Sequence, residues 1–395
     1  MKKILFMCIN MNIGGTEKAL LTMLNKIDSS KYDVTLLMLE EYGGFLNEIP
    51  KFVKIKYVNE YNEIKKFIKE PPQILSKKLI RDRKYIKAFN TLINYSLSKV
   101  TNDISYYYKY LLKNISSIEE EYDLAVAYAG PMDFITYFVI NKIKARKKVQ
   151  WIHFDITKIA FNKKFAEKNY KRFDRIFVVS EEGKNKLNEL IPSIKEKTDV
   201  FKNIISSNLI NNMANNSMGF NDKFNGIRIL TVGRLSLEKG QDIILPVLIK
   251  LKENGYNVKW YCIGDGALKD DIERDIEKYE INDKYILLGA MTNPYPFMNE
   301  CDIYVQTSRH EGYCITLAEA RCFNKPIVTT NFTGSSEQIK NYKTGLIVNF
   351  DIDEIYSAIK ELLDDNSLMA GIKDNLMSES VDTSLEMEKF NDLFK

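Results

Sequence analysis

Two glutamates, Glu311 and Glu319, are separated by seven residues in the stretch 308–320. The apolar run before this stretch suits a buried strand and the residues after Cys314 suit a helix, so Glu311 falls in a strand-to-helix turn. A helix N-terminus offers unpaired N–H groups and partial positive charge, which favours anions. Eight residues of ideal helix rise about 12 Å, and the turn shortens this separation somewhat. Two carboxylates so placed could hold hydroxyl groups at either end of a diphosphate that the helix amides bind. The alternative is a surface helix with two solvated glutamates.

The two glutamates form a Glu-x7-Glu motif that resembles a known one. Glu311 is followed by Gly312 and an aromatic residue, and Glu319 lies within a Leu-Ala-Glu-Ala sequence. The motif is similar to that of retaining glycosyltransferases with the GT-B fold, in particular glycosyltransferase family four. The resemblance implies that Glu311 meets the donor sugar and Glu319 the nucleotide ribose. The amides expected to hold the donor diphosphate are those at the helix start, Cys314, Ile315 and Thr316.

A second cluster, residues 232–240, follows the first expected strand of the C-terminal half. Gly233 would let the backbone approach a ligand, and Arg234 and Lys239 could clamp phosphate oxygens. The order Gly-Arg-Leu, then Lys-Gly, also resembles family four, which implies that both cations neutralise charge on the leaving nucleotide. The alternative is a tight turn with solvated cations.

No metal and no cofactor other than the donor substrate is expected, because these cations and the helix amides would carry the phosphate charge. The Asp-x-Asp sequence at Asp351 and Asp353 is interpreted as a helix cap, since acidic residues suit a helix start.

Glycine and histidine supply the remaining candidates. Gly14 and Gly15 follow the first expected strand and match the family's glycine loop, which implies close approach to the diphosphate or the sugar; the alternative is a plain turn. Gly264 lies in a Gly-x-Gly turn that the resemblance places beside the nucleotide, and its expected role is mainly structural.

His153 ends an expected strand, where doubly wound folds bind ligands. It is similar to a family histidine near the sugar; the alternative is a satisfied core histidine.

Strand and helix patterns alternate along both halves of the 395 residues, which predicts an α/β protein with two doubly wound Rossmann-like domains facing across a cleft, the GT-B fold. The expected strands are 2–9, 33–39, 53–58, 123–129, 149–153, 175–180 and 199–203, then 228–232, 258–263, 285–288, 301–306, 326–330 and 345–348. The first expected domain, at 1–205, is on the acceptor side and contains a basic helical insertion at about 61–118. A linker at 206–225 leads to a nucleotide-sugar-binding domain at 226–380, and a C-terminal helix at 381–395 is expected to cross back to the first domain.

Charge is divided unevenly. Residues 1–205 hold 37 Lys and Arg against 24 Asp and Glu, and the rest hold 20 against 29. Such an imbalance indicates an anionic partner for the first half. Within the insertion, apolar residues alternate with basic ones in a basic amphipathic helix pair: Ile74, Leu75, Leu79 and Ile86 with Lys77, Lys78, Arg81, Arg83, Lys84 and Lys87. This pattern predicts an anionic membrane surface as partner; the alternative is a packed helix pair with its basic face in water. No nucleic acid is expected, because no reading motif accompanies the charge.

The five cysteines are scattered, without a Cys-x-x-Cys pair, and no apolar run approaches the roughly 20 residues of a membrane helix. These features predict a reduced cytoplasmic protein, and the basic helices predict that it is peripheral on the inner face of the cell membrane.

The resemblance implies retaining transfer from a nucleoside diphosphate sugar, with uridine favoured over guanosine. The acceptor would be a glycan, a lipid-linked molecule or a teichoic acid-type polymer in bacterial cell-surface assembly. The family's favoured account of retention is same-face attack with the leaving phosphate as base; by position, Asp155 is the nearest candidate for a nucleophile instead. The rival functions are a GT-B nucleotide-sugar epimerase and a non-catalytic glycosyltransferase-like subunit of a complex.

Overall fold

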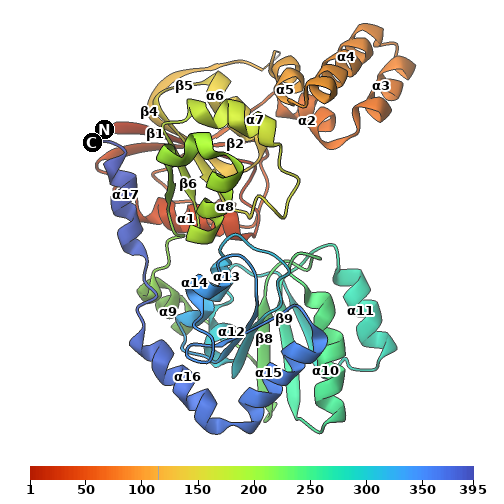
Figure 1. Cartoon of the computed structure of the whole chain (residues 1–395), viewed down its shortest axis with the longest axis vertical. Helices are drawn as coiled ribbons and strands as arrows, with labels where there is room; N and C mark the ends of the chain where they lie inside the picture. Colours follow the sequence, from red (N-terminus) through yellow and green to blue (C-terminus); the bar gives the residue numbers. More distant parts are fainter. Residues whose placement is uncertain (114) are drawn as a thin grey trace. The chain divides into compact units, whose positions relative to one another are not determined.

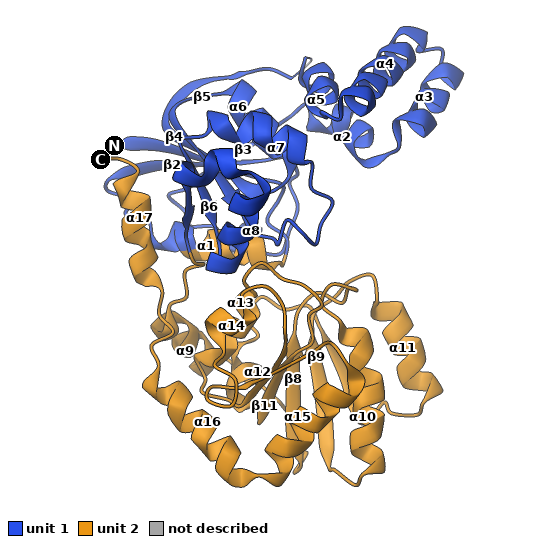
Figure 2. Cartoon of the chain, viewed as in Figure 1, with its two compact units in different colours: residues 1–12, 23–201 blue, residues 13–22, 202–395 orange. Residues whose placement is uncertain are grey.

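The computed structural model describes residues 1–113 and 115–395, and these form two compact units, each built on one parallel sheet. The first unit comprises Met1–Asn12 and Met23–Phe201, and the second comprises Ile13–Thr22 and Lys202–Lys395 (Figure 2). The short segment Ile13–Thr22 therefore belongs with the second unit, although it follows the first strand of the chain.

The sheet of the first unit has the order β3-β2-β1-β4-β5-β6-β7, with every neighbouring pair parallel. The order reverses between β1 and β4, which is the doubly wound arrangement. Its strands are β1 (Lys2–Cys8), β2 (Tyr32–Met38), β3 (Lys54–Tyr57), β4 (Ile118–Gly130), β5 (Ile143–Ile152), β6 (Arg175–Val178) and β7 (Thr198–Val200). Its helices outside the insertion are α6 (Asp133–Lys142), α7 (Lys163–Asn169) and α8 (Glu181–Leu190), while α1 (Gly15–Lys26) is divided between the units.

The second unit repeats this topology with the order β10-β9-β8-β11-β12-β13. Its strands are β8 (Ile227–Val232), β9 (Val258–Ile263), β10 (Tyr285–Gly289), β11 (Ile303–Gln306), β12 (Ile327–Thr330) and β13 (Leu346–Val348). Its helices are α9 (Ser207–Asn215), α10 (Ile244–Glu253), α11 (Lys269–Lys278), α12 (Tyr295–Glu300), α13 (Ile315–Arg321), α14 (Ser335–Gln338), α15 (Ile352–Asp364), α16 (Asn366–Ser378) and α17 (Met387–Asp392) (Figure 1). Apolar side chains of α10 and α15 share one core with β8, β9 and β11.

The strands expected from the sequence are present in both sheets, and the predicted fold class is confirmed. β4 and β5 begin at Ile118 and Ile143, earlier than the expected 123 and 149. Their early residues carry many charged side chains, so apolar pattern alone did not mark them as strand. Parallel pairing of β4 with β5 nevertheless extends over these residues.

The predicted linker and tail contain regular structure. α9 lies within 206–225 and buries Ile210 and Ala214 on one face. The expected last helix is present as a 3-10 turn at Ser384–Glu386 followed by α17. Thr383 N donates to Ile205 O at 3.0 Å, which ties the tail to the start of the second unit's main segment. Its expected return to the first domain stays a prediction.

Four helices form the insertion between β3 and β4: α2 (Tyr61–Lys69), α3 (Pro72–Arg81), α4 (Tyr85–Thr101) and α5 (Ser105–Leu112). We call them the helical lobe. Its own small core consists of Phe67, Leu75, Leu79, Ala88, Tyr107 and Leu111. Of the four apolar residues expected to contact a membrane, Ile74 and Ile86 are exposed, whereas Leu75 and Leu79 pack into this core and are not available for that contact.

Among the helices of residues 1–113 and 115–395, none combines the length and the apolar character that crossing a bilayer requires.

Candidate functional site

The turn after β11 is held by a chain of buried hydrogen bonds. Tyr304 OH donates to Gln306 Oε1 at 2.8 Å, Gln306 Nε2 to Ser308 Oγ at 2.9 Å, and Ser308 Oγ to Glu311 Oε1 at 2.7 Å. Gln306 and Ser308 are buried, so each link lies in a low-dielectric interior that strengthens it. The strand end therefore fixes where the Glu311 carboxylate points.

Glu311 also pairs with a cation. Lys239 Nζ donates to Glu311 Oε1 at 2.5 Å, and the Glu311 side chain is 10% exposed. Burial lowers the pKa of Lys239, but the Glu311 carboxylate together with Cys314 outweighs burial and holds that pKa above its usual value. Two residues predicted from separate motifs, one for the sugar and one for the phosphates, thus form one ion pair.

The loop that carries Arg234 and Lys239 is docked against the turn after β11 through backbone contacts. Thr307 Oγ1 donates to Lys239 O at 3.0 Å, and Arg309 N donates to Glu238 O at 2.8 Å. Gly240 has φ +71°, and a Cβ there would lie 2.1 Å from Thr307 O. Only glycine therefore allows this approach.

Buried Gln241 also stabilises the loop that carries Arg234, because its Nε2 donates to Arg234 O at 2.9 Å. Sequence reasoning assigned no role to Gln241, Gln306 or Ser308. The signal available was their polarity beside buried strand ends, where an amide or hydroxyl needs a partner.

Glu319 is not a solvated glutamate. It is buried within α13, and Tyr295 OH donates to its Oε1 at 2.6 Å. Burial raises the pKa of Glu319, against the opposing effects of Lys18 and Tyr295. Lys18 lies over the Tyr295 ring at 5.4 Å, so Lys18 and Tyr295 are neighbours of this site that the sequence did not indicate.

The glycine loop meets the same group of residues within the second unit. A Cβ on Gly14 would lie 3.6 Å from Arg234 Nη2 and 2.5 Å from Glu17 Oε2, and one on Gly15 would lie 4.0 Å from Ile315 Cδ1. Burial raises the pKa of Glu17, and Arg234 opposes that effect. The structure thus brings Gly14 and Gly15 beside Arg234 and the start of α13.

Gly264 and Gly233 differ in how much space surrounds them. A Cβ on Gly264 would lie 1.9 Å from Gly233 O, so Gly264 is required by its close packing on the neighbouring turn. A Cβ on Gly233 would find its nearest atom, Gln241 Nε2, at 3.5 Å, an ordinary contact distance. Gly264 thus has the structural role that the sequence predicts, while space alone does not require glycine at 233.

The expected helix start is confirmed at Ile315, one residue after Cys314, which has φ 54° and ψ 84°. Gln338 Nε2 donates to Tyr313 O and so fixes the carbonyl before this residue. Thr316 Oγ1 donates to Gln306 Oε1 at 3.2 Å, which links the helix start to the hydrogen-bond chain from β11. α13 is seven residues long.

His153 lies in the first unit, directly after β5. It is buried, and its Nε2 has no hydrogen-bond partner among the described residues. Burial lowers its pKa to about 3, against an opposing backbone hydrogen bond with Tyr128, so the ring is neutral at pH 7. A neutral ring with one nitrogen unengaged can still accept or donate a hydrogen bond to a ligand.

Asp155, the candidate for a nucleophile, is engaged elsewhere. Lys186 Nζ lies 2.8 Å from its Oδ2, and Thr157 donates to Oδ1 through its amide at 2.8 Å and its hydroxyl at 2.6 Å. Such a fully bonded carboxylate orders the turn after β5 rather than presenting a free oxygen.

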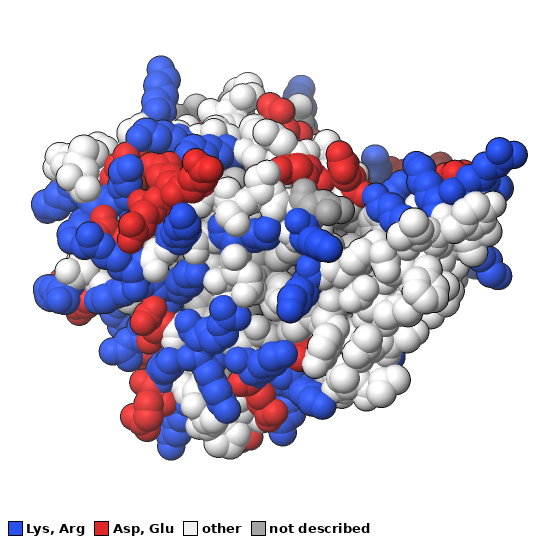
Figure 3. Space-filling view, turned by 90° about the horizontal axis from the view of Figure 1, so that it is seen from above, with Lys and Arg blue, Asp and Glu red and all other residues white. Residues whose placement is uncertain are grey.

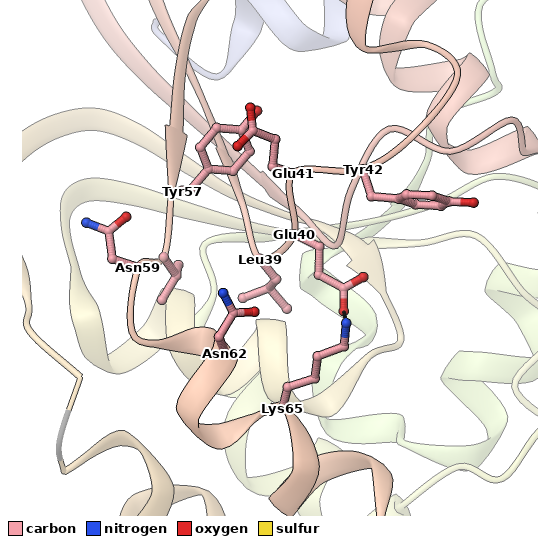
Figure 4. Close-up of a pocket in the computed structure, with 9 residues that line it drawn as sticks. Leu39, Glu40, Glu41, Tyr42, Tyr57, Asn59, Asn62 and Lys65 are labelled. Carbon is pink, nitrogen blue, oxygen red and sulfur yellow. Dashed lines mark ion pairs between the residues drawn. The ribbon is translucent and has the colours of Figure 1, made fainter.

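The first unit contains a cavity of about 600 Å³ at the carboxyl ends of β2 and β3. Its lining residues are Leu39, Glu40, Glu41, Tyr42, Tyr57, Val58, Asn59, Asn62 and Lys65. Figure 4 shows the Glu40–Lys65 ion pair, with the Tyr42 ring extending away from the other side chains. Amides, carboxylates and phenols of this kind bind hydroxyl-rich molecules through hydrogen bonds.

The Asp-x-Asp sequence is a cap, as predicted. Asp351 precedes α15, and its Oδ1 accepts hydrogen bonds from Asp353 N at 2.9 Å and Glu354 N at 3.1 Å. Within the described part of the chain, no group of three or more His, Cys, Asp or Glu side chains is placed to hold a metal ion.

Part of the unit that holds these residues is similar to a known family. Residues 218–377 match the family described as Glycosyl transferases group 1. The match covers β8 to α16 and includes Arg234, Lys239, Glu311 and Glu319.

Curated relatives align over comparable lengths. An N-acetylgalactosaminyltransferase of Campylobacter jejuni, named for a diacetylbacillosaminyl-diphospho-undecaprenol acceptor, is 28% identical over 48% of this chain and 52% of its own length. A poly(ribitol-phosphate) alpha-N-acetylglucosaminyltransferase of Staphylococcus aureus is 29% identical over 41% of this chain and 34% of its own. The chain thus spans about half of the length of the first relative and about a third of the length of the second.

A solved structure resembles the whole chain. HepE from Anabaena, crystallised with UDP-glucose, has a TM-score of 0.71 at 18% identity and covers 100% of this chain and 99% of its own. This likeness, with the two doubly wound sheets, shows the GT-B fold.

Proposed function

We propose that this protein is a glycosyltransferase that moves a sugar from a nucleoside diphosphate sugar, with UDP as the nucleotide, to a glycan, lipid-linked or teichoic acid-type acceptor. The observation that carries the proposal is the Lys239–Glu311 ion pair, which couples a phosphate-binding cation to the carboxylate assigned to the sugar. The family match over residues 218–377, the glycan-assembling relatives and UDP-glucose in the structural neighbour support it.

In the proposed reaction the acceptor hydroxyl oxygen bonds to the anomeric carbon as the bond from that carbon to the phosphate oxygen breaks. Retention follows if both events take place on the same face of the sugar, with the hydroxyl proton passing to the leaving phosphate. Arg234, Lys239 and the amides of Cys314, Ile315 and Thr316 would stabilise the diphosphate charge, which develops only as the bond breaks. His153 would contact the sugar as a neutral donor or acceptor.

We further propose that the acceptor binds in the cavity at the carboxyl ends of β2 and β3, because doubly wound sheets bind ligands at this edge. The test compares an undecaprenyl-diphosphate-linked sugar with poly(ribitol phosphate) and continues with the acceptor that the wild-type protein uses more efficiently. With that acceptor, Asn62→Ala should raise the acceptor KM about five- to tenfold and leave the donor KM unchanged. An unchanged acceptor KM would place the acceptor elsewhere.

The activity itself is tested with a panel of UDP- and GDP-sugars in a thermal-shift assay, followed by donor hydrolysis without acceptor. A shift with one UDP-sugar and slow release of UDP are the expected results. Conversion of the donor to an isomeric nucleotide sugar would indicate the epimerase instead. A donor that binds but is neither hydrolysed nor transferred would indicate the non-catalytic subunit.

A further inference from the structure

Helix α4 of the helical lobe has its apolar and polar sides reversed relative to a helix that packs on a core in water. Small and polar side chains face inward: Ala88, Thr91 and Ser98 are buried. Large apolar side chains face outward, with Ile86 80%, Phe89 63% and Val100 87% exposed. A surface helix ordinarily buries its large apolar residues and exposes charged ones. Folding of the lobe therefore does not explain this arrangement.

The outward residues form one continuous stripe. Ile86, Phe89, Ile93, Leu97 and Val100 are all exposed, and at about 100° per residue they fall within an arc of about 80°. The two charged residues of α4 lie off the stripe, with their ammonium groups over aromatic rings, Lys87 over Phe67 at 5.1 Å and Lys99 over Tyr95 at 5.4 Å. We call the five exposed apolar residues Ile86, Phe89, Ile93, Leu97 and Val100 the α4 stripe.

Exposed basic side chains lie on α3, which packs against α4, and on the turn that joins the two helices; we call them the basic border. Lys77, Lys78 and Arg81 of α3, with Arg83 and Lys84 of the following turn, are all exposed. Among the described residues only Lys78 of these five has an ion-pair partner, Glu70 at 2.8 Å. Figure 3 shows a broad uncharged surface on the lobe, with Lys and Arg and fewer Asp and Glu along one edge.

We propose that the α4 stripe docks on an anionic lipid bilayer, with its five apolar side chains at the boundary between headgroups and acyl chains and the basic border on the lipid phosphates. An apolar helix face flanked by Lys and Arg has the chemistry of an interfacial helix. A second copy of the chain fits less well, because a two-fold contact would bring the same basic border against itself. The docking does not depend on the transfer reaction.

The test is flotation of the full chain with vesicles of phosphatidylglycerol and phosphatidylcholine, and with phosphatidylcholine alone. We expect binding to the anionic vesicles that weakens at high salt. Phe89→Gln with Ile93→Gln should lower the bound fraction at least tenfold and leave the melting temperature and donor hydrolysis unchanged, since both residues are exposed. Met377→Gln with Leu385→Gln, two exposed apolar residues of the second unit, is the matched control and should float like wild type.

Failure of the wild-type protein to float with anionic vesicles at low salt overturns the proposal. Equal flotation of the α4 double variant and its control also overturns it. A wild-type dimer in solution that the double variant makes monomeric, with no vesicle binding by either, would assign the α4 stripe to a second copy of the chain.

Discussion

At the scale of residues, Arg234 and Lys239 are both assigned to the donor diphosphate but differ in their surroundings. Arg234 is exposed, whereas Lys239 is part of an ion pair with a largely buried carboxylate. Each change to Ala should lower kcat/KM about 100-fold through loss of phosphate stabilisation. Only Lys239→Ala should also lower the melting temperature, because it leaves the Glu311 carboxylate without its cation. Near-normal turnover in both variants would remove them from the donor site.

The two glutamates allow a second comparison. Glu319→Gln keeps an oxygen to accept from Tyr295 OH and should mainly raise the donor KM, since ribose contacts persist throughout the reaction. Glu311→Gln weakens the pair with Lys239 and should lower kcat more, because contacts to the sugar tighten as it gains positive charge. Steady-state kinetics at saturating acceptor measures both effects, and equal losses of kcat would contradict this division of roles.

His153 gives a pH dependence with a defined sign. Its pKa is about 3 in the folded protein, against a usual value of 6.5. Between these values the unfolded chain binds a proton that the folded chain does not, so stability falls as pH falls through this window. The effect is on the order of a few kcal/mol at most. His153→Gln should show a shallower fall in melting temperature from pH 7 to pH 5; parallel curves would mean that His153 does not contribute.

At the scale of elements, the packing of the loop of residues 233–240 requires glycine at position 240 but not at position 233. Gly240→Ala places a Cβ against Thr307 O at a positive φ, so we expect a loss of about 1–3 kcal/mol in unfolding free energy and weaker donor binding. Gly233→Ala meets only ordinary contacts and serves as the control. Urea denaturation and donor KM measure the two effects. A Gly233→Ala variant as unstable as Gly240→Ala would argue against this packing account.

Local patterns predicted the strands well because buried parallel strands are runs of apolar residues between turns, as in β9 and β12. They also placed Glu311 in a turn and Glu319 in a helix. The bond from Lys239 to Glu311 joins residues 72 positions apart, and no local pattern encodes such a pair. The reversed α4 was missed for a related reason, because apolar periodicity marks a face without saying which side the core lies on.

At the scale of the whole molecule, the donor candidates other than His153 belong to one unit. Glu311, Glu319, Arg234, Lys239 and the glycine loop all fall in Ile13–Thr22 or Lys202–Lys395. Hydrogen exchange with saturating UDP should therefore slow in residues 13–22, 233–240 and 311–319 and stay unchanged in residues 39–65 around the first unit's cavity. Replacing UDP by GDP is the control. Protection by UDP at 39–65 alone would move the donor site to the other unit.

The reversed α4 also affects how the protein behaves during expression and purification. An uncovered apolar stripe on a surface helix promotes self-association when nothing covers it. Protein made in excess over the surface it binds should therefore aggregate as its concentration rises, and a mild detergent added at lysis should increase the soluble yield. The Phe89→Gln, Ile93→Gln variant should reach the same yield without detergent, as the ratio of supernatant to pellet after centrifugation would show.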